Sequence, residues 1–184
     1  MLTQKTPARL VLTGALLLVA MSLLVAGCSR SPLEQAEQPT SSEPTLLTRL
    51  VDRAPNGASA APVNLYTEAV ISAETGGRLE LLDVVLEIPP GAVPNDTTFS
   101  IFIPDDAVFY NEFGTDGLVF DVPVTVTMSY RGANLLGINE STIRIAYHNP
   151  ETGEFEDVDC RLNLLSGTVT AELNHFSAYG LISD

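Results

Sequence analysis

The sequence contains no tryptophan, only two histidines and two cysteines, and few basic residues. Nine Lys and Arg residues stand against 23 Asp and Glu residues in a chain of 184, a formal net charge of −14. We therefore expect no nucleic acid partner, because nucleic acid binding depends on Lys and Arg that neutralise phosphates. The same charge disfavours broad contact with anionic lipid. Without tryptophan and with few clustered aromatic residues, the chain lacks the usual stacking platform for a carbohydrate.

One long apolar run, residues 10–26, follows Lys5 and Arg9 and is followed by Gly27 and Cys28. A positive start, an apolar centre and a small-residue end are typical of a secretory signal. The alternative is a transmembrane anchor, since about 18 apolar residues are enough for a spanning helix. The small residues directly before Cys28 favour the signal. We expect residues 1–27 to be a signal peptide.

The junction Val25-Ala26-Gly27-Cys28 resembles the bacterial lipobox. The resemblance implies cleavage before Cys28, a diacylglyceryl group on its sulfur, and acylation of the new amino terminus, for example with palmitate. Two or three acyl chains, at about 0.8 kcal/mol per buried CH₂, would tether the protein permanently. Aspartate after the cysteine favours retention at the inner membrane in bacteria with two membranes. Ser29 therefore implies the outer membrane there, and the outer face of the cell membrane in other hosts.

Residues 28–62 are rich in Pro, Ser, Ala, Glu and Gln and cannot bury a core. We expect a mostly disordered linker that, as a flexible coil, spans about 30 to 35 Å on average. A short linker helix is expected inside it, on the helical spacing of four apolar residues, Leu46, Leu47, Leu50 and Val51. Such a helix would be marginal alone. A docking site for a partner is the less favoured interpretation.

From residue 63 the sequence changes to short β-branched and alternating runs separated by turn residues. Many short strands without a long helix predict a single all-β domain, an antiparallel β-sandwich over residues 63–184. The predicted strands are 63–72, 78–88, 97–103, 118–130, 142–147, 155–164, 168–173 and 177–182. The clearest alternation places Val124, Val126, Met128 and Tyr130 on one face, as in a half-solvated strand.

With Cys28 assigned to lipid, Cys160 has no partner for an intramolecular disulfide. Cys160 alternates with Val158, Leu162 and Leu164, a period of two that places all four side chains on one strand face. We expect Cys160 to be a small buried hydrophobic residue. The alternative, a reactive thiol or an intermolecular disulfide, needs an exposure that this pattern argues against.

Five stretches of this region resemble, in order, the ZU-five domain, the β-sandwich module of zonula occludens proteins, netrin receptors and ankyrins. They are residues 76–81, 85–93, 120–126, 147–155 and 174–179, which include Pro89-Pro90-Gly91 at a predicted strand end. The resemblance implies the same sandwich fold and a role in binding other proteins. The spectrin partner of ankyrins does not follow for an acidic bacterial envelope protein.

His175-Phe176-Ser177 is the one combination of residues for which a reaction can be written. In some relatives of the ZU-five domain a His-Phe-Ser triplet cleaves itself between Phe and Ser. The resemblance implies that Ser177 Oγ would attack the Phe176 carbonyl, with His175 as general base. Other modules end in the same triplet and stay uncut. Parity places His175 on the face of Leu173 if no bulge intervenes, so a core or rim histidine is the favoured interpretation.

Two groups of acidic residues raise the question of a calcium site: Asp105 with Asp106, and Glu154 and Glu156 with Asp157 and Asp159. Neither has the spacing of an EF-hand. Alternation also divides the second group between two strand faces, so solvated acidic surface is favoured over a metal site. His148 and His175 alone form no zinc motif, and no phosphate-binding loop or Gly-x-Ser-x-Gly elbow is present. We expect neither a metal nor a cofactor.

Together these features predict a non-catalytic, lipid-anchored cell-envelope protein whose sandwich binds or scaffolds another protein. Its expected partners are the membrane, through Cys28, and an unidentified envelope protein. Two alternatives remain open. One is a self-cleaving module cut between Phe176 and Ser177, and the other is a carbohydrate or cell-wall binding module, which rests on fold analogy alone.

Overall fold

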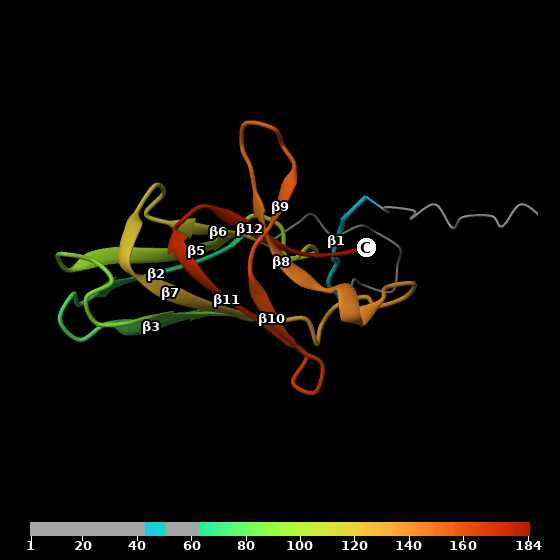
Figure 1. Cartoon of the computed structure of the whole chain (residues 1–184), viewed down its shortest axis with the longest axis horizontal. Coiled ribbons are helices and arrows are strands. Elements are labelled where there is room, and N and C mark those ends of the chain that lie inside the picture. Colours follow the sequence, from blue (N-terminus) through green and yellow to red (C-terminus); the bar gives the residue numbers. More distant parts are fainter. Residues whose placement is uncertain (1–42, 51–62) are drawn as a thin grey trace, which may run out of the picture. The chain divides into compact units, whose positions relative to one another are not determined.

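The structure is a computed structural model that describes residues 43–50 and 63–184. These residues form two antiparallel sheets packed together, which confirms the predicted all-β sandwich (Figure 1). The predicted signal peptide, the lipidation site Cys28 and most of the predicted linker lie outside the described residues. Within the two described ranges, no helix has the length and apolar content needed to cross a bilayer.

The larger sheet has seven strands, six of them in the order β2-β5-β6-β12-β8-β9. These six are β2 Leu65–Ile71, β5 Thr97–Ile103, β6 Tyr110–Gly114, β12 Ala178–Ser183, β8 Arg144–His148 and β9 Phe155–Asp157. The seventh strand, β1 (Thr45–Leu46), pairs with the end of β12, while β6 pairs with its start. The last strand of the chain is therefore enclosed by β6 and β1 on one side and by β8 on the other.

The smaller sheet has five strands in the order β10-β11-β7-β4-β3. They are β10 Cys160–Asn163, β11 Thr168–His175, β7 Val119–Ser129, β4 Val84–Ile88 and β3 Gly77–Leu81. The central strand β7 buries Val124, Val126 and Met128 completely, while Thr125 and Thr127 lie half-buried on its other face. This is the alternation that the sequence predicts, and it fixes which face of the sheet meets the core.

The core between the sheets contains a group of phenylalanine rings. The Phe176 centroid lies 4.7 Å from that of Phe120 and 5.2 Å from that of Phe99, both with near-perpendicular rings. Phe113 lies 5.7 Å from Phe176 on another side. Edge-to-face pairs of this kind add about 0.5–1.5 kcal/mol each beyond the burial of their area. Residues from both sheets thus meet around Phe176.

Two of the predicted strands are each two strands in the structure. Residues 78–88 form the hairpin of β3 and β4, whose turn contains Leu82 at a φ of 54°. Leucine rarely adopts a positive φ, so the sequence does not mark this turn. Residues 155–164 divide into β9 and β10, which belong to different sheets. The apolar alternation continues across that break, which is why a single strand was predicted.

The predicted linker helix is wrong over residues 43–50, and its last predicted residue, Val51, lies outside the described residues. Residues 43–50, the N-terminal strap, are extended: β1 pairs with β12, and Leu47 N donates to Leu181 O at 2.8 Å. Leu47 is 2% exposed and Arg49 is 9% exposed, while Thr48 between them is exposed. Burial thus follows a period of two, because pairing with β12 gives this segment hydrogen bonds that an isolated short helix would not retain. The strap belongs to the sandwich, although the sequence assigned it to the linker.

Candidate functional site

The His175-Phe176-Ser177 triplet forms the corner at which the chain passes from the smaller sheet to the larger one. His175 is the last residue of β11, and Ser177 directly precedes β12. Phe176 between them is 1% exposed and inserts into the phenylalanine core. Its backbone N donates to Leu118 O at 3.0 Å, and Ser177 O accepts from Phe113 N at 2.9 Å. The triplet therefore forms the corner, and its central residue Phe176 packs in the core.

His175 does not lie on the buried face that parity predicted. The register of β11 shifts between Leu173 and His175, so a β-bulge intervenes and leaves His175 exposed. Its ring stands edge-on to that of Tyr147, with 5.6 Å between the centroids. A bulge inserts one extra residue and reverses the faces beyond it. The sequence carries no glycine or proline at this position to mark it.

The structure places the nucleophile and the base of the predicted self-cleavage at different depressions. Ser177 lines a groove on the outer face of the larger sheet, whereas His175 lines a separate depression with Tyr147 and Tyr179. Among the residues that the structure describes, the His175 ring and Ser177 Oγ share no hydrogen bond. A general base must lie within hydrogen-bond reach of the proton that it removes. The proposed nucleophile and base are close in sequence but serve different surfaces.

Tyr179 contributes a hydrogen bond that holds this corner. Its hydroxyl donates to His175 O at 3.1 Å, and the side chain is 2% exposed. Burial, with a smaller effect from Tyr147, raises the pKa of Tyr179 above its ordinary value of 10.0. The tyrosine therefore stays neutral and keeps its hydrogen bond over the whole physiological pH range.

Cys160 is half-buried, less enclosed than predicted. It packs against the core together with Leu162, but Leu164 is 56% exposed. Val158 lies before the start of β10, so the four residues do not share one strand. The Cys160 thiol is free and lines a shallow depression beside Asp159 and Arg161.

Three of the six acidic residues considered for calcium accept local hydrogen bonds. Asp105 Oδ1 accepts from Ala107 N at 2.8 Å, and Asp106 Oδ1 accepts from Val63 N at 3.1 Å. Glu156 accepts from Asn149 Nδ2 at 2.6 Å in the β8–β9 hairpin. Over residues 43–50 and 63–184, no three His, Cys, Asp or Glu side chains are grouped as metal ligands would be.

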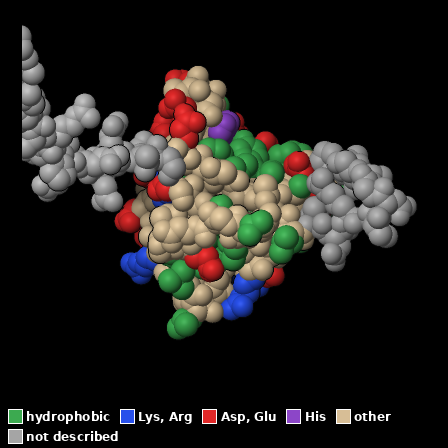
Figure 2. Space-filling model, turned by 90° about the vertical axis from the view of Figure 1, so that its right-hand side faces the viewer, with side chains coloured by type: hydrophobic (Ala, Val, Ile, Leu, Met, Phe, Trp, Pro, Cys, Tyr) green, Lys and Arg blue, Asp and Glu red, His purple; other side chains and the backbone are tan. Residues whose placement is uncertain are grey.

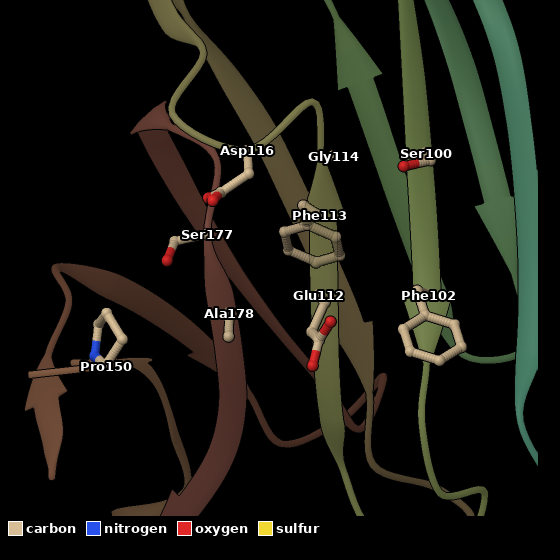
Figure 3. Close-up of a pocket in the computed structure, with 9 residues that line it drawn as sticks. All are labelled: Ser100, Phe102, Glu112, Phe113, Gly114, Asp116, Pro150, Ser177 and Ala178. Atoms are coloured by element: carbon tan, nitrogen blue, oxygen red, sulfur yellow. The ribbon is translucent and has the colours of Figure 1, made fainter. Parts of the chain in front are cut away.

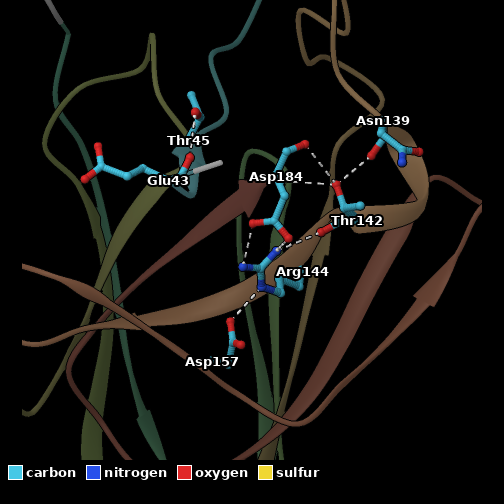
Figure 4. Close-up of polar contacts among 7 residues, drawn as sticks. All are labelled: Glu43, Thr45, Asn139, Thr142, Arg144, Asp157 and Asp184. Atoms are coloured by element: carbon cyan, nitrogen blue, oxygen red, sulfur yellow. Dashed lines mark hydrogen bonds and ion pairs between the residues drawn. The ribbon is translucent and has the colours of Figure 1, made fainter. Parts of the chain in front are cut away.

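Arg144 gathers two further carboxylates. Its Nε lies 2.6 Å from Asp157 Oδ1, and its Nη2 lies 3.0 Å from Asp184 Oδ1 (Figure 4). Nη1 also donates to Asp184 Oδ2, which makes the second contact bidentate. Thr142 joins the same network through its carbonyl and hydroxyl groups. Asp157 thus has a structural partner, and the end of the chain is fixed to β8.

A groove with a volume of about 340 Å³ lies on the outer face of the larger sheet (Figure 3). Strand register places Phe102, Glu112 and Ala178 in one row across β5, β6 and β12. Gly114 and Ala178 have little or no side chain, so the sheet is hollow between Phe102 on one side and Pro150 on the other. A Cβ at Gly114 would lie 2.3 Å from Ser100 Oγ, so a larger residue here would require the Ser100 side chain to move.

Two carboxylates line this groove, Glu112 on β6 and Asp116 in the loop that follows. Both are exposed. In the described part of the chain neither side chain has an ion-pair or hydrogen-bond partner, and none of the groove residues is basic. The groove therefore carries uncompensated negative charge next to the aromatic ring of Phe102.

Sequence reasoning missed the groove because it missed β6. Alternation is present in Tyr110–Gly114, but the buried positions are occupied by Asn111 and Phe113. Asn111 is fully buried with its Nδ2 3.6 Å from Met128 Sδ, an arrangement that apolar periodicity does not reveal. The Arg49–Asp83 ion pair of the strap was missed for a related reason, since a buried arginine looks like a linker residue in sequence.

No protein-family model matches the chain, and comparisons with curated proteins and with solved structures gave no match. The ZU-five resemblance therefore remains a prediction from its motifs.

Proposed function

We propose that this protein is a lipid-anchored protein of the bacterial cell envelope whose ZU-five-like sandwich binds or scaffolds another envelope protein without catalysing a reaction. The lipobox-like junction at Cys28 supports the anchor. The membrane would be the outer membrane in a host with two membranes, and otherwise the cell membrane, with the sandwich on its outer face. Acyl chains would supply the membrane contact, because the acidic domain is repelled by anionic lipid.

The binding role is supported by exposed apolar side chains on the outer face of the larger sheet. Tyr66 is 57% exposed and Val70 is 71% exposed on β2, which lies at the edge of the sheet. Phe102 lies directly opposite Tyr66 on β5. Exposed apolar side chains gathered on one face mark interaction surfaces. An edge strand also offers unpaired backbone groups to a partner.

The corner geometry supports a non-catalytic role over self-cleavage. Phe176 fills the core, and His175 and Ser177 line different depressions. We expect the purified full chain to give one intact mass that begins at Cys28 with its lipids. A fragment that ends at Phe176 would establish self-cleavage instead. A Cys28→Ala chain should lose the lipid mass, and an unchanged mass increment would contradict the anchor.

The binding role is tested by photo-cross-linking in the host envelope. A photoreactive phenylalanine analogue at position 70 should form defined adducts with another protein. The same analogue at position 127, on the outer face of the smaller sheet, is the control. Absence of protein adducts from both positions would contradict the proposed function, and adducts from position 127 alone would assign binding to the other sheet.

A further inference from the structure

The groove between Phe102 and Pro150 has a chemistry that its position in the sheet does not require. Its floor is the backbone of β6 and β12 at Gly114 and Ala178 (Figure 3). The apolar lining comes from Phe102, Phe113, Ala178 and Pro150, and the two titratable groups are the carboxylates of Glu112 and Asp116. An exposed sheet face is stable without such a hollow. The stability of the fold therefore does not account for the groove.

None of the arginines of the described domain lines the groove. Arg49 pairs with Asp83, Arg78 with Glu80, and Arg144 with Asp157 and Asp184. Arg131 donates to the carbonyl groups of Ser166 and Leu165. Arg161 lines the depression beside Cys160, on the smaller sheet. In the part of the chain that the structure describes, no cation of the protein itself neutralises Glu112 or Asp116.

We propose that this groove binds an extended segment of a partner protein through an arginine or lysine side chain. Charge complementarity selects the occupant, since two free carboxylates in a groove that also exposes apolar side chains favour a cation with an apolar stem. The aliphatic part of the side chain would lie against Ala178 and Pro150, as long basic side chains often do on apolar surface. The charged end would meet Glu112, which lies next to Phe102 across the strand pair, and the Phe102 ring can add a cation–π contact, while Asp116 adds negative charge from the loop at the other end of the groove (Figure 3).

This inference rests on the proposed protein-binding role and adds the chemistry of the partner. The surroundings of the groove suit a segment better than a single ion. Tyr66, Phe102, Glu112 and Ala178 lie in register across four adjacent strands, so the binding row continues from the groove to the edge strand β2. A chain that crosses this row could place a basic residue in the groove and apolar residues over Tyr66.

The test measures binding of a peptide library to the purified full chain. The library contains extended peptides with a central arginine or lysine among apolar residues, and matched peptides with citrulline or norleucine at that position. The basic peptides should bind more tightly than their neutral counterparts, and added salt should reduce the difference. Equal binding of basic and neutral peptides, or no binding by any of them, would overturn the proposal.

Two variants assign the binding to the groove. Glu112→Gln with Asp116→Asn should weaken the basic peptides about fivefold, because exposed ion pairs each contribute modestly. Ala178→Leu should fill the floor and weaken basic and neutral peptides alike. The matched control is Glu87→Gln with Glu172→Gln. These two exposed carboxylates lie on the smaller sheet, in the strands on either side of β7, and both are in register with Thr125. A control that loses as much affinity as the groove variant would reduce the effect to net charge and overturn the assignment.

Two further outcomes separate this inference from the proposed function. If spermidine displaces the peptides at equal concentration, the groove binds small polycations and the proposal of a protein segment falls. If cross-linking from position 70 persists unchanged in the Glu112→Gln and Asp116→Asn variant, the protein-binding role stands and the groove is not its site. Loss of those adducts, together with preference for basic peptides, supports both.

Discussion

The strap and the groove use acidic residues in opposite ways. In the strap region, Asp83 meets Arg49 through two contacts of 2.8 and 2.9 Å, and both side chains are largely buried. Arg49 also donates to Val108 O and lies 4.2 Å from the centre of the Phe109 ring. In the groove, Glu112 and Asp116 are exposed and have no such partner among the described residues. One carboxylate fixes the fold, and two remain available to another molecule.

The depression beside the strap and the groove at Phe102 differ in the same way. A depression of about 450 Å³ beside the strap is lined by Arg49 and Arg131 as well as by Asp83 and Asp106, so its charges balance. The groove at Phe102 has carboxylates alone. In the view of Figure 2 basic side chains are sparse, and acidic ones gather at the top, where Figure 1 places the β8–β9 hairpin. The two depressions therefore differ in charge, since arginine accompanies the carboxylates only in the one beside the strap.

Among the substitutions considered, loss of the Leu47 side chain from the strap should reduce the free energy of unfolding most. Leu47→Ala removes a side chain that is 2% exposed and should lower the free energy of unfolding by about 3 kcal/mol. Urea denaturation of the purified chain measures this change. Leu50, three residues later, is 69% exposed and provides the control. If Leu50→Ala costs as much as Leu47→Ala, the strap is not packed as the structure shows.

Loss of Arg49 tests whether its ion pair differs from those on the surface. Arg49→Ala leaves Asp83 without its partner in a mostly buried position and should cost about 2 kcal/mol of unfolding free energy. The control is Arg78→Ala, because Arg78 and Glu80 are each more than half exposed. That surface pair should contribute less than about 1 kcal/mol. Equal costs for the two variants in denaturation would remove the distinction between paired and free acidic regions.

The sequence predicts those parts of the fold that are determined within a single segment of the chain. It does not predict the parts that depend on how distant segments align. The alternation of β7 and the turn at Asn149 to Gly153 were readable, because one strand face or one hairpin determines them. The strap was not readable, because its neighbours are the last strand of the chain and the loop before β6. The groove depends on the register of β5, β6 and β12, and no local pattern reports how three distant segments align.

The pH dependence of stability should report on the corner at Tyr179. Burial raises the pKa of Tyr179 above 10.0, so its stabilising effect is complete below pH 10.0 and is lost as the pH rises further. Above that pH the unfolded chain releases the proton while the folded chain retains it. Tyr179→Phe should cost about 1 kcal/mol at neutral pH through the lost hydrogen bond to His175 O.

The decisive measurement for Tyr179 is the difference between wild type and variant as a function of pH. It should shrink from pH 10 upward, because the variant has no hydroxyl to ionise at this position. Tyr110 and Tyr130 also have raised pKa values through burial, and both remain in the variant, so their effects cancel in the difference. A difference that stays constant with pH would show that the Tyr179 hydroxyl is accessible to solvent.

The smallest expected effect is on the groove side. Glu112→Gln with Asp116→Asn should change the free energy of unfolding by less than about 0.5 kcal/mol, because both side chains are exposed and make no contact that folding requires. Relief of repulsion in a strongly acidic domain makes a slight stabilisation the expected sign. Denaturation in urea, with the Glu87→Gln and Glu172→Gln chain as charge-matched control, measures the change. A loss comparable to that of Arg49→Ala would mean that the groove carboxylates serve the fold as Asp83 does, and the contrast between the two regions would disappear.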